Sequence, residues 1–198
     1  NVGKIPMTEI SVAEKLEEFR RMGENYRGQS FGPIAAYAEH GAIVHYSATP
    51  ETDKEIKADS FLLLDTGGQY LEGTTDITRT VALGNITDEM KKHFTAVLKG
   101  NLNLVSAKFR KGCLGINFDY LAREALWEMG LDYNHGTGHG VGYYLNVHEA
   151  PNGFRWKQVP ERNESAAFEA GMITSDEPGL YLIERFLHIR VKARQRRL

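Results

Sequence analysis

Apolar residues recur at helical spacing in three stretches, residues 8–22, 87–110 and 118–129. Ser11 and Glu14 are placed as a capping box for the first helix, Thr87 as a cap for the second, and Gly130 as the left-handed residue that ends the third. The apolar positions of the first two helices are Ile10, Ala13, Leu16 and Phe19, and then Met90, Phe94, Val97, Leu98, Leu102 and Val105. This pattern predicts three amphipathic helices.

Shorter stretches have the composition of β-strands. Residues 32–45 alternate small and β-branched side chains, and residues 61–64 form a continuous apolar run, as buried strands do. Asp65 ends this run, three glycines follow, and Asp76 begins a second β-favouring run, which predicts a hairpin. Residues 171–182 predict a strand that is broken by its proline. The chain therefore belongs to the α+β fold class, without internal repeats.

The composition is that of an ordinary folded domain. Of 198 residues, 41% are hydrophobic and 25% are charged, which allows a sizeable core. A net charge of −2 argues against nucleic acid as a partner, because such binding needs an extended positive surface. No apolar run has the roughly 18 to 20 residues of a membrane span, and residues 1–10 lack a signal-peptide pattern. We expect a cytoplasmic protein without membrane contact.

Two further features limit the chemistry. Cys113 is the single cysteine, so no internal disulfide can form, and we expect it to be a packing residue rather than a nucleophile. The C-terminal segment RVKARQRRL carries five basic residues and no acid, which predicts a solvated tail rather than a binding patch.

Three of the seven histidines lie in HGTGHGVGYYLNVHE, residues 135–149. His135 and His139 have the i, i+4 spacing of zinc ligands on a helix, but each interior glycine costs about 0.8 to 1 kcal/mol of helix stability relative to alanine. A loop and strand are therefore expected, in which glycine lets backbone or ligand approach closely. Histidines beside glycines are also often structural or solvated, and this alternative stays open.

Asp65, Asp76 and Glu177 are the candidate carboxylate ligands. Alone, the two aspartates fit a strand end and a turn, and Glu177, directly before a proline, fits a surface turn. Together with His139 they supply three oxygen ligands and one imidazole, and we expect no other cluster of acids and histidines in the chain. Such a set suits Mn²⁺ and similar divalent ions, and two ions about 3.5 to 4 Å apart would need a bridging carboxylate such as Asp76.

The segments DTGGQYLEGTTDITRT, HGTGHGVG followed by LNVHE, and SDEPGLY resemble the metal-site motifs of the M24 metallopeptidases. Within that family they are most similar to the cytosolic type of Xaa-Pro aminopeptidase, over residues 8–181. The resemblance implies the pita-bread fold, a curved mixed β-sheet covered by helices. It also implies that residues 1–198 are a catalytic domain that is incomplete at both ends, with residues 182–198 as an atypical basic tail.

The resemblance assigns ligands by position. It makes Asp65 a ligand of one metal ion, Asp76 a bridge between two, and His139 and Glu177 further ligands, with Glu177 also the proton shuttle. The implied cofactors are two divalent ions, Mn²⁺ first and Zn²⁺ or Co²⁺ as alternatives, which activate a hydroxide.

The same resemblance assigns three histidines to the substrate. His45 matches the family's substrate-side histidine, and His135 and His148 match the two that hold the scissile peptide and its developing charge. The implied substrates are peptides with proline at position two, and the family suggests a homodimer.

One expected ligand is missing from the sequence. The family has a bridging glutamate in a segment of the type I-R-I-E-N, and the matching stretch here is Ile189 to Ala193, with Lys192 in place of the acid. No Asp or Glu follows Glu184, so a small shift of register does not restore the ligand. We therefore expect weak or single-metal occupancy. A metal-free binding module with this fold is the alternative, but four retained ligands and three histidines favour the enzyme.

Overall fold

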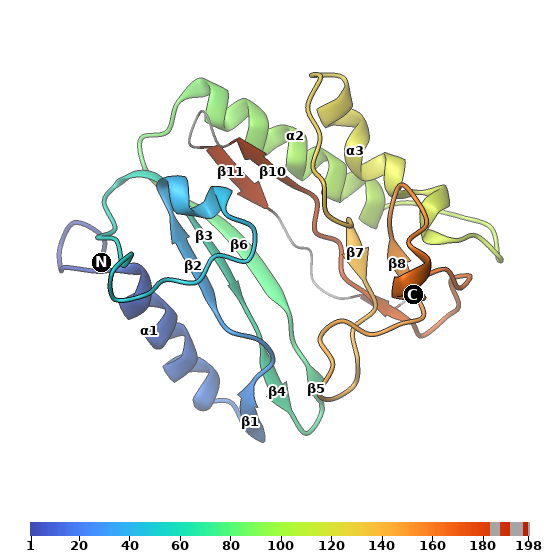
Figure 1. The fold of residues 1–198 in the computed structure, drawn as a ribbon, viewed down its shortest axis with the longest axis horizontal. Helices are drawn as coiled ribbons and strands as arrows, with labels where there is room; N and C mark the ends of the chain where they lie inside the picture. The colour runs from blue at the N-terminus through green and yellow to red at the C-terminus, as the bar shows by residue number, and fades with distance from the viewer. Residues whose placement is uncertain (183–186, 191–195, 198) are drawn as a thin grey trace.

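An antiparallel sheet with the order β2–β3–β6 forms the centre of the N-terminal half of the molecule (Figure 1). This computed structural model describes residues 1–182, 187–190 and 196–197. Strands β3 (Asp59–Thr66) and β6 (Ile77–Gly84) pair along their whole length, and β2 (Ile34–Tyr37) pairs with the other edge of β3. Strand β3 contains the apolar run predicted at residues 61–64. It delivers Asp65 to the end of the sheet, opposite Thr78 of β6.

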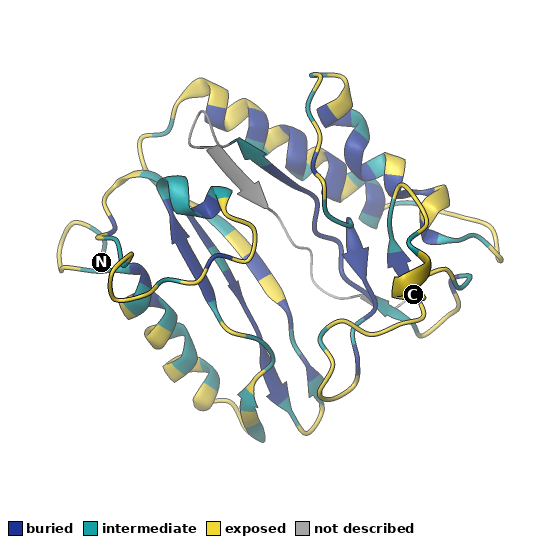
Figure 2. Ribbon diagram, in the orientation of Figure 1, coloured by how far each residue is buried: buried dark blue, intermediate teal, exposed yellow. Residues whose placement is uncertain are grey.

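Helix α1 (Glu9–Arg21) lies along this sheet (Figure 1). Its Val12 belongs to a cluster of buried apolar residues that also contains Ala35, Tyr37, Ile56 and Leu62. Figure 2 shows the consequence, because the outward side of α1 is exposed while β2 and β3 are buried. The helix therefore covers the sheet with one narrow face.

Two details of the predicted first helix are wrong. The N-cap is Thr8, which forms a capping box with Ser11, so the box predicted from Ser11 and Glu14 is one turn too late. Phe19 was predicted on the apolar face of this helix but is 60% exposed. The buried helix positions are instead Glu9 and Val12.

Short elements extend the sheet region. Strands β1 (Tyr26–Gln29), β4 (Gly68–Tyr70) and β5 (Gly73–Thr74) form a second small sheet in the order β1–β4–β5. The turn between β5 and β6 carries Asp76, so the predicted hairpin is present. The strand expected over residues 32–45 is shorter than predicted: it ends at Tyr37, and the 3₁₀ helix η1 (Ala38–Ala42) follows.

Helices α2 (Asp88–Val105) and α3 (Asp119–Trp127) pack against each other and against the strands beside them (Figure 1). The cap at Thr87 and the left-handed Gly130, at φ +69°, are confirmed. Helix α2 ends at Val105 rather than near Arg110. Leu102, expected on its apolar face, is 52% exposed. The core against these helices consists of Phe61, Met90, Ala96, Val97, Ala125, Leu126, Tyr133 and Leu180.

The C-terminal half is made of short strands and single turns. These are η2 (Gly115–Asn117), β7 (Gly138–His139), β8 (Gly153–Phe154), η3 (Pro160–Arg162), β9 (Ile173–Thr174), β10 (Gly179–Leu182), β11 (Leu187–Arg190) and β12 (Arg196–Arg197). The pairs β7–β8, β10–β11 and β9–β12 are antiparallel. The strand predicted to break at its proline is present as β9 and β10. Within the described residues, no helix is both long and apolar enough to cross a membrane.

The contact between α2 and α3 gives a test of the fold. On helix propensity alone, Gly100→Ala should stabilise the protein by about 1 kcal/mol. A Cβ at Gly100 would lie 2.1 Å from the carbonyl oxygen of Ala122, so we expect destabilisation of roughly 1 to 3 kcal/mol instead. Chemical denaturation measures the difference, with the exposed neighbour Lys99→Ala as a nearly neutral control. A Gly100→Ala protein as stable as the wild type would contradict this packing.

Candidate metal centre

Asp76, His139 and Glu177 bring their ligand atoms within 4.8 Å of one another, and all three side chains are buried. They come from separate parts of the sequence: the turn before β6, strand β7, and the segment that leads into β10. His139 Nε2 lies 3.2 Å from Asp76 Oδ2 and 2.9 Å from Glu177 Oε1. The imidazole nitrogen therefore faces two carboxylates in an interior environment.

The orientation of His139 decides what can occupy this space. Its Nδ1 lies 2.9 Å from the carbonyl oxygen of Gly140, which can only accept, so Nδ1 donates a hydrogen. In the neutral ring, Nε2 then carries a lone pair that faces two carboxylate oxygens. Three electron-rich atoms in this arrangement need a proton or a cation among them. The donor set of carboxylates and one imidazole fits a divalent ion of the Mn²⁺ type.

Ser175 joins two of these residues. Its hydroxyl donates to Glu177 Oε1 at 2.6 Å and accepts from the backbone N–H of His139 at 2.9 Å. Backbone bonds from Ser175 N to His139 O and from Glu177 N to Thr137 O, both 2.8 Å, run alongside. The histidine and the glutamate are thus fixed relative to each other.

Glycines make this close approach sterically possible, as predicted from the sequence. A Cβ at Gly138 would lie 2.0 Å from the carbonyl oxygen of Ser175, and one at Gly140 would lie 2.1 Å from that of Glu149. The i, i+4 pair His135 and His139 lies in a loop and a two-residue strand, so the expected absence of a helix is confirmed.

Asp65 is buried at the end of β3 but lies outside this group of three among the described residues. It lines a cavity of about 110 Å³ together with Asp76, His45 and His148. A larger cavity of about 380 Å³ is lined by His135, His139 and Glu177, and again by His45 and His148. All seven predicted site residues therefore line one of two cavities that share two histidines.

The three other histidines of the predicted site differ in their surroundings. His135 donates from Nδ1 to the carbonyl oxygen of Gly136 at 2.8 Å, and its ring lies edge-on to Tyr181 at 5.3 Å. The ring of His148 lies 4.2 Å from that of His139 in a T-shaped arrangement. His45 is exposed and has a left-handed backbone, at φ +59°.

Burial also changes acidities around the site. It raises the pKa of Asp176, directly before Glu177, to about 8, although Asn101 acts in the opposite direction. Burial and the charge of Asp65 raise the pKa of Tyr181. Both groups therefore favour their neutral forms at neutral pH.

A buried ion pair that was not predicted from the sequence supports the histidine loop. Arg123 of α3 pairs with Asp119 at 2.6 Å, and both side chains are fully buried. The same guanidinium donates to the carbonyl oxygens of Tyr133 and His135, while Thr137 Oγ1 donates to Asp119 at 2.5 Å. The i, i+4 spacing of Asp119 and Arg123 was the available signal.

The sequence pattern of Metallopeptidase family M24 matches residues 3–193, and the chain belongs to this family. Aminopeptidase P1 of Arabidopsis thaliana is 47% identical over 175 residues, which are 88% of this chain and 27% of that protein. The Xaa-Pro aminopeptidase of Caenorhabditis elegans is 44% identical over 180 residues, 90% of this chain and 29% of the relative. This chain spans about a quarter to three tenths of the length of these relatives.

Solved structures agree with this assignment. The X-prolyl aminopeptidase from C. elegans, described as a cytosolic enzyme with a di-nuclear active site, has a TM-score of 0.89 and 40% identity, covering 96% of this chain and 30% of that one. An Xaa-Pro dipeptidase from Bacillus anthracis has a TM-score of 0.80 at 33% identity, covering 94% and 49%. The fold is the pita-bread fold expected from the sequence motifs. The position of the missing fifth ligand, Lys192, lies outside the described residues, so reduced metal occupancy stays a prediction.

The double role of Ser175 can be tested through metal affinity. Ser175→Ala removes the hydroxyl that orients both His139 and Glu177, and we expect Mn²⁺ to bind roughly 10- to 100-fold more weakly. Calorimetric titration with Mn²⁺ measures this, and Ser106→Ala, at the exposed end of α2, is the control. Equal Mn²⁺ affinities for the Ser175→Ala protein and the wild type would show that the hydroxyl does not hold these ligands in place.

Proposed function

We propose that this chain carries the catalytic site of a metalloaminopeptidase that hydrolyses the bond between an N-terminal residue and a following proline. The observation that carries the proposal is the buried group of Asp76, His139 and Glu177, beside cavities that three further histidines line. Relatives named for Xaa-Pro aminopeptidase activity, at 44 to 47% identity, support it. The chain covers only part of each relative, so activity and substrate are proposed for it.

The proposed cofactors are two divalent metal ions, with Mn²⁺ as the first candidate. Asp65, Asp76, His139 and Glu177 would hold them. Asp76 is the candidate shared by both ions, because it belongs to the buried group of three and also lines a cavity with Asp65. When bound, such ions lower the pKa of a water molecule and stabilise negative charge on a carbonyl oxygen.

The protein side chains supply binding and proton transfer. Glu177, whose Oε1 accepts from Ser175, is the proposed group that takes a proton from the attacking water and passes it to the leaving nitrogen. His135 donates a hydrogen bond from Nδ1 to the carbonyl oxygen of Gly136. Its Nε2 is therefore the proposed contact for a peptide group, as acceptor when neutral and as donor when protonated. His148 and His45 line both cavities, where they would hold the peptide and the charge that develops on its carbonyl oxygen.

Release of the first residue from an Xaa-Pro peptide, measured with and without Mn²⁺, tests the proposal. His148→Ala should lower kcat by roughly 100-fold through loss of charge stabilisation, while Mn²⁺ binding stays intact. His139→Ala should lose both metal and activity. Hydrolysis that does not depend on a divalent ion, or unchanged turnover by the His148→Ala protein, would contradict the assignment. Binding of the peptide without release of its first residue would instead favour the metal-free binding module.

A further inference from the structure

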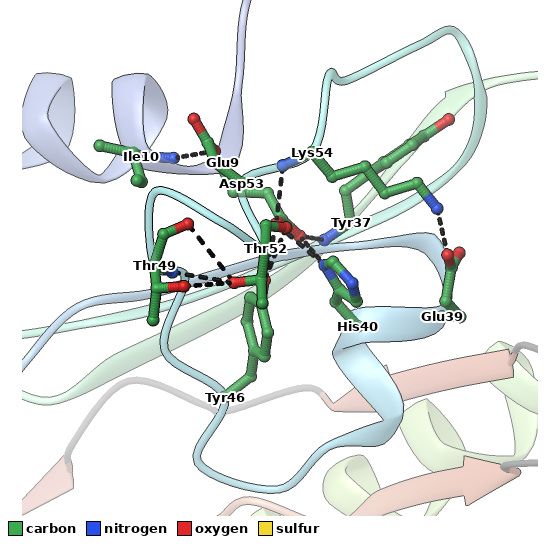
Figure 3. Close-up of polar contacts among 10 residues, drawn as sticks. All are labelled: Glu9, Ile10, Tyr37, Glu39, His40, Tyr46, Thr49, Thr52, Asp53 and Lys54. Carbon is green, nitrogen blue, oxygen red and sulfur yellow. Dashed lines mark hydrogen bonds and ion pairs between the residues drawn. The ribbon is translucent and has the colours of Figure 1, made fainter.

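A buried carboxylate with a histidine partner lies outside the candidate metal centre, at Glu9 (Figure 3). Glu9 stands in the first turn of α1 and is 0% exposed. A fully buried carboxylate is costly unless hydrogen-bond donors surround it, so its partners indicate what this charge is used for.

The donors to Glu9 come from the connection between β2 and β3. Its Oε1 accepts from Tyr37 N at 2.7 Å, and its Oε2 accepts from the Tyr46 hydroxyl at 2.9 Å and from Lys54 N at 3.3 Å. His40 Nδ1 lies 3.0 and 2.9 Å from the two oxygens. Figure 3 shows these donors gathered around the carboxylate. One side chain of α1 therefore ties together the beginning, the middle and the end of this loop.

The rings of the loop reinforce the same arrangement. His40 and Tyr46 are stacked, with centroids 4.6 Å apart and an interplanar angle of 28°. Burial, and acceptance of its hydrogen bond by Glu9, raise the pKa of Tyr46, which keeps the hydroxyl a donor. Tyr46 N also bonds to Ile43 O at 3.1 Å, and Ile43 N to His40 O at 3.0 Å.

His45 directly precedes Tyr46 and lines both cavities of the candidate site. Its φ of +59° lies in the left-handed region, which is unfavourable for a residue with a Cβ. Such a conformation persists where the surroundings hold it in place. The His45 side chain is exposed, whereas the next residue is buried and bonded to Glu9. The restraint therefore reaches His45 through Tyr46.

We propose that Glu9 is a positioning residue that, through the Tyr46 hydroxyl, holds His45 in the conformation that faces the substrate cavity. The inference rests on the proposed peptidase function, in which His45 contacts the peptide. The proposed metal ligands are carried by other segments: the end of β3, the turn before β6, strand β7 and the approach to β10. Loss of the Glu9–Tyr46 bond should therefore affect the use of substrate and leave metal binding unchanged.

Tyr46→Phe is the variant of choice, because it removes the hydroxyl and keeps the ring, whereas replacement of the buried Glu9 risks unfolding. We expect kcat/KM for an Xaa-Pro peptide to fall roughly tenfold from misplacement of His45, with unchanged Mn²⁺ affinity. Tyr26→Phe is the matched control, because Tyr26 donates to Glu17 on the same helix at 2.6 Å, away from the loop. It should leave kcat/KM unchanged.

A double-mutant cycle separates positioning from general stabilisation. If Glu9 acts through His45, Tyr46→Phe should have no further effect on kcat/KM in a His45→Ala background. The same tenfold loss in both backgrounds overturns the proposal, because the effect would then not pass through His45.

Hydrogen exchange supplies a readout that does not depend on activity. Tyr46→Phe should speed amide exchange in residues 38–47 and leave residues 137–141 of the metal centre unchanged. Unchanged protection of residues 38–47 overturns the anchoring, whatever the activity. A wild-type chain that releases no residue from Xaa-Pro peptides with Mn²⁺ present overturns the proposed function and the substrate role of His45, even if the exchange result is as expected.

Discussion

The convergence of buried carboxylates from separate segments is the constraint on which the candidate site depends. Asp76 and Glu177 place carboxylate oxygens within 4.8 Å of each other in the interior, and Asp65 lies buried nearby. Two such charges repel by about 3 kcal/mol at an effective dielectric constant of about 20, a large part of the 5 to 15 kcal/mol that stabilises a typical domain. A divalent cation among them would offset this repulsion. The fold has to hold the acids together against their own repulsion.

The structure does this by backbone pairing and buried polar networks. Ser175 fixes His139 and Glu177 side by side, and Gly138 allows their segments to approach closely. Behind the histidine loop, Arg123 and Asp119 form a fully buried pair that also binds the loop carbonyls. Glu9 likewise accepts hydrogen bonds from the loop that carries His45 and anchors it. Buried charged side chains outside the group of proposed ligands thus hold the loops that line the cavities.

Much of this arrangement could be predicted from the sequence. Asp76, His139 and Glu177 could be singled out because they stand in short glycine- and proline-containing motifs that resemble those of the M24 metallopeptidases. Helix rotation was less predictable: Phe19 and Leu102 satisfy the apolar period, yet both are exposed, since periodicity does not say which neighbouring face another element will cover. The Glu9–His40 pair could not be found at all, because 31 residues separate its members and no local spacing links them.

We infer that a divalent cation bound among these buried carboxylates stabilises the folded chain. Thermal unfolding of the metal-free and Mn²⁺-loaded chain, for the wild type and for Glu177→Gln, tests this most directly. The account predicts that Mn²⁺ raises the Tm of the wild type, and that the metal-free Glu177→Gln protein is at least as stable as the metal-free wild type but gains less from Mn²⁺. A wild type whose Tm does not respond to Mn²⁺, or a variant that gains as much as the wild type, would contradict it.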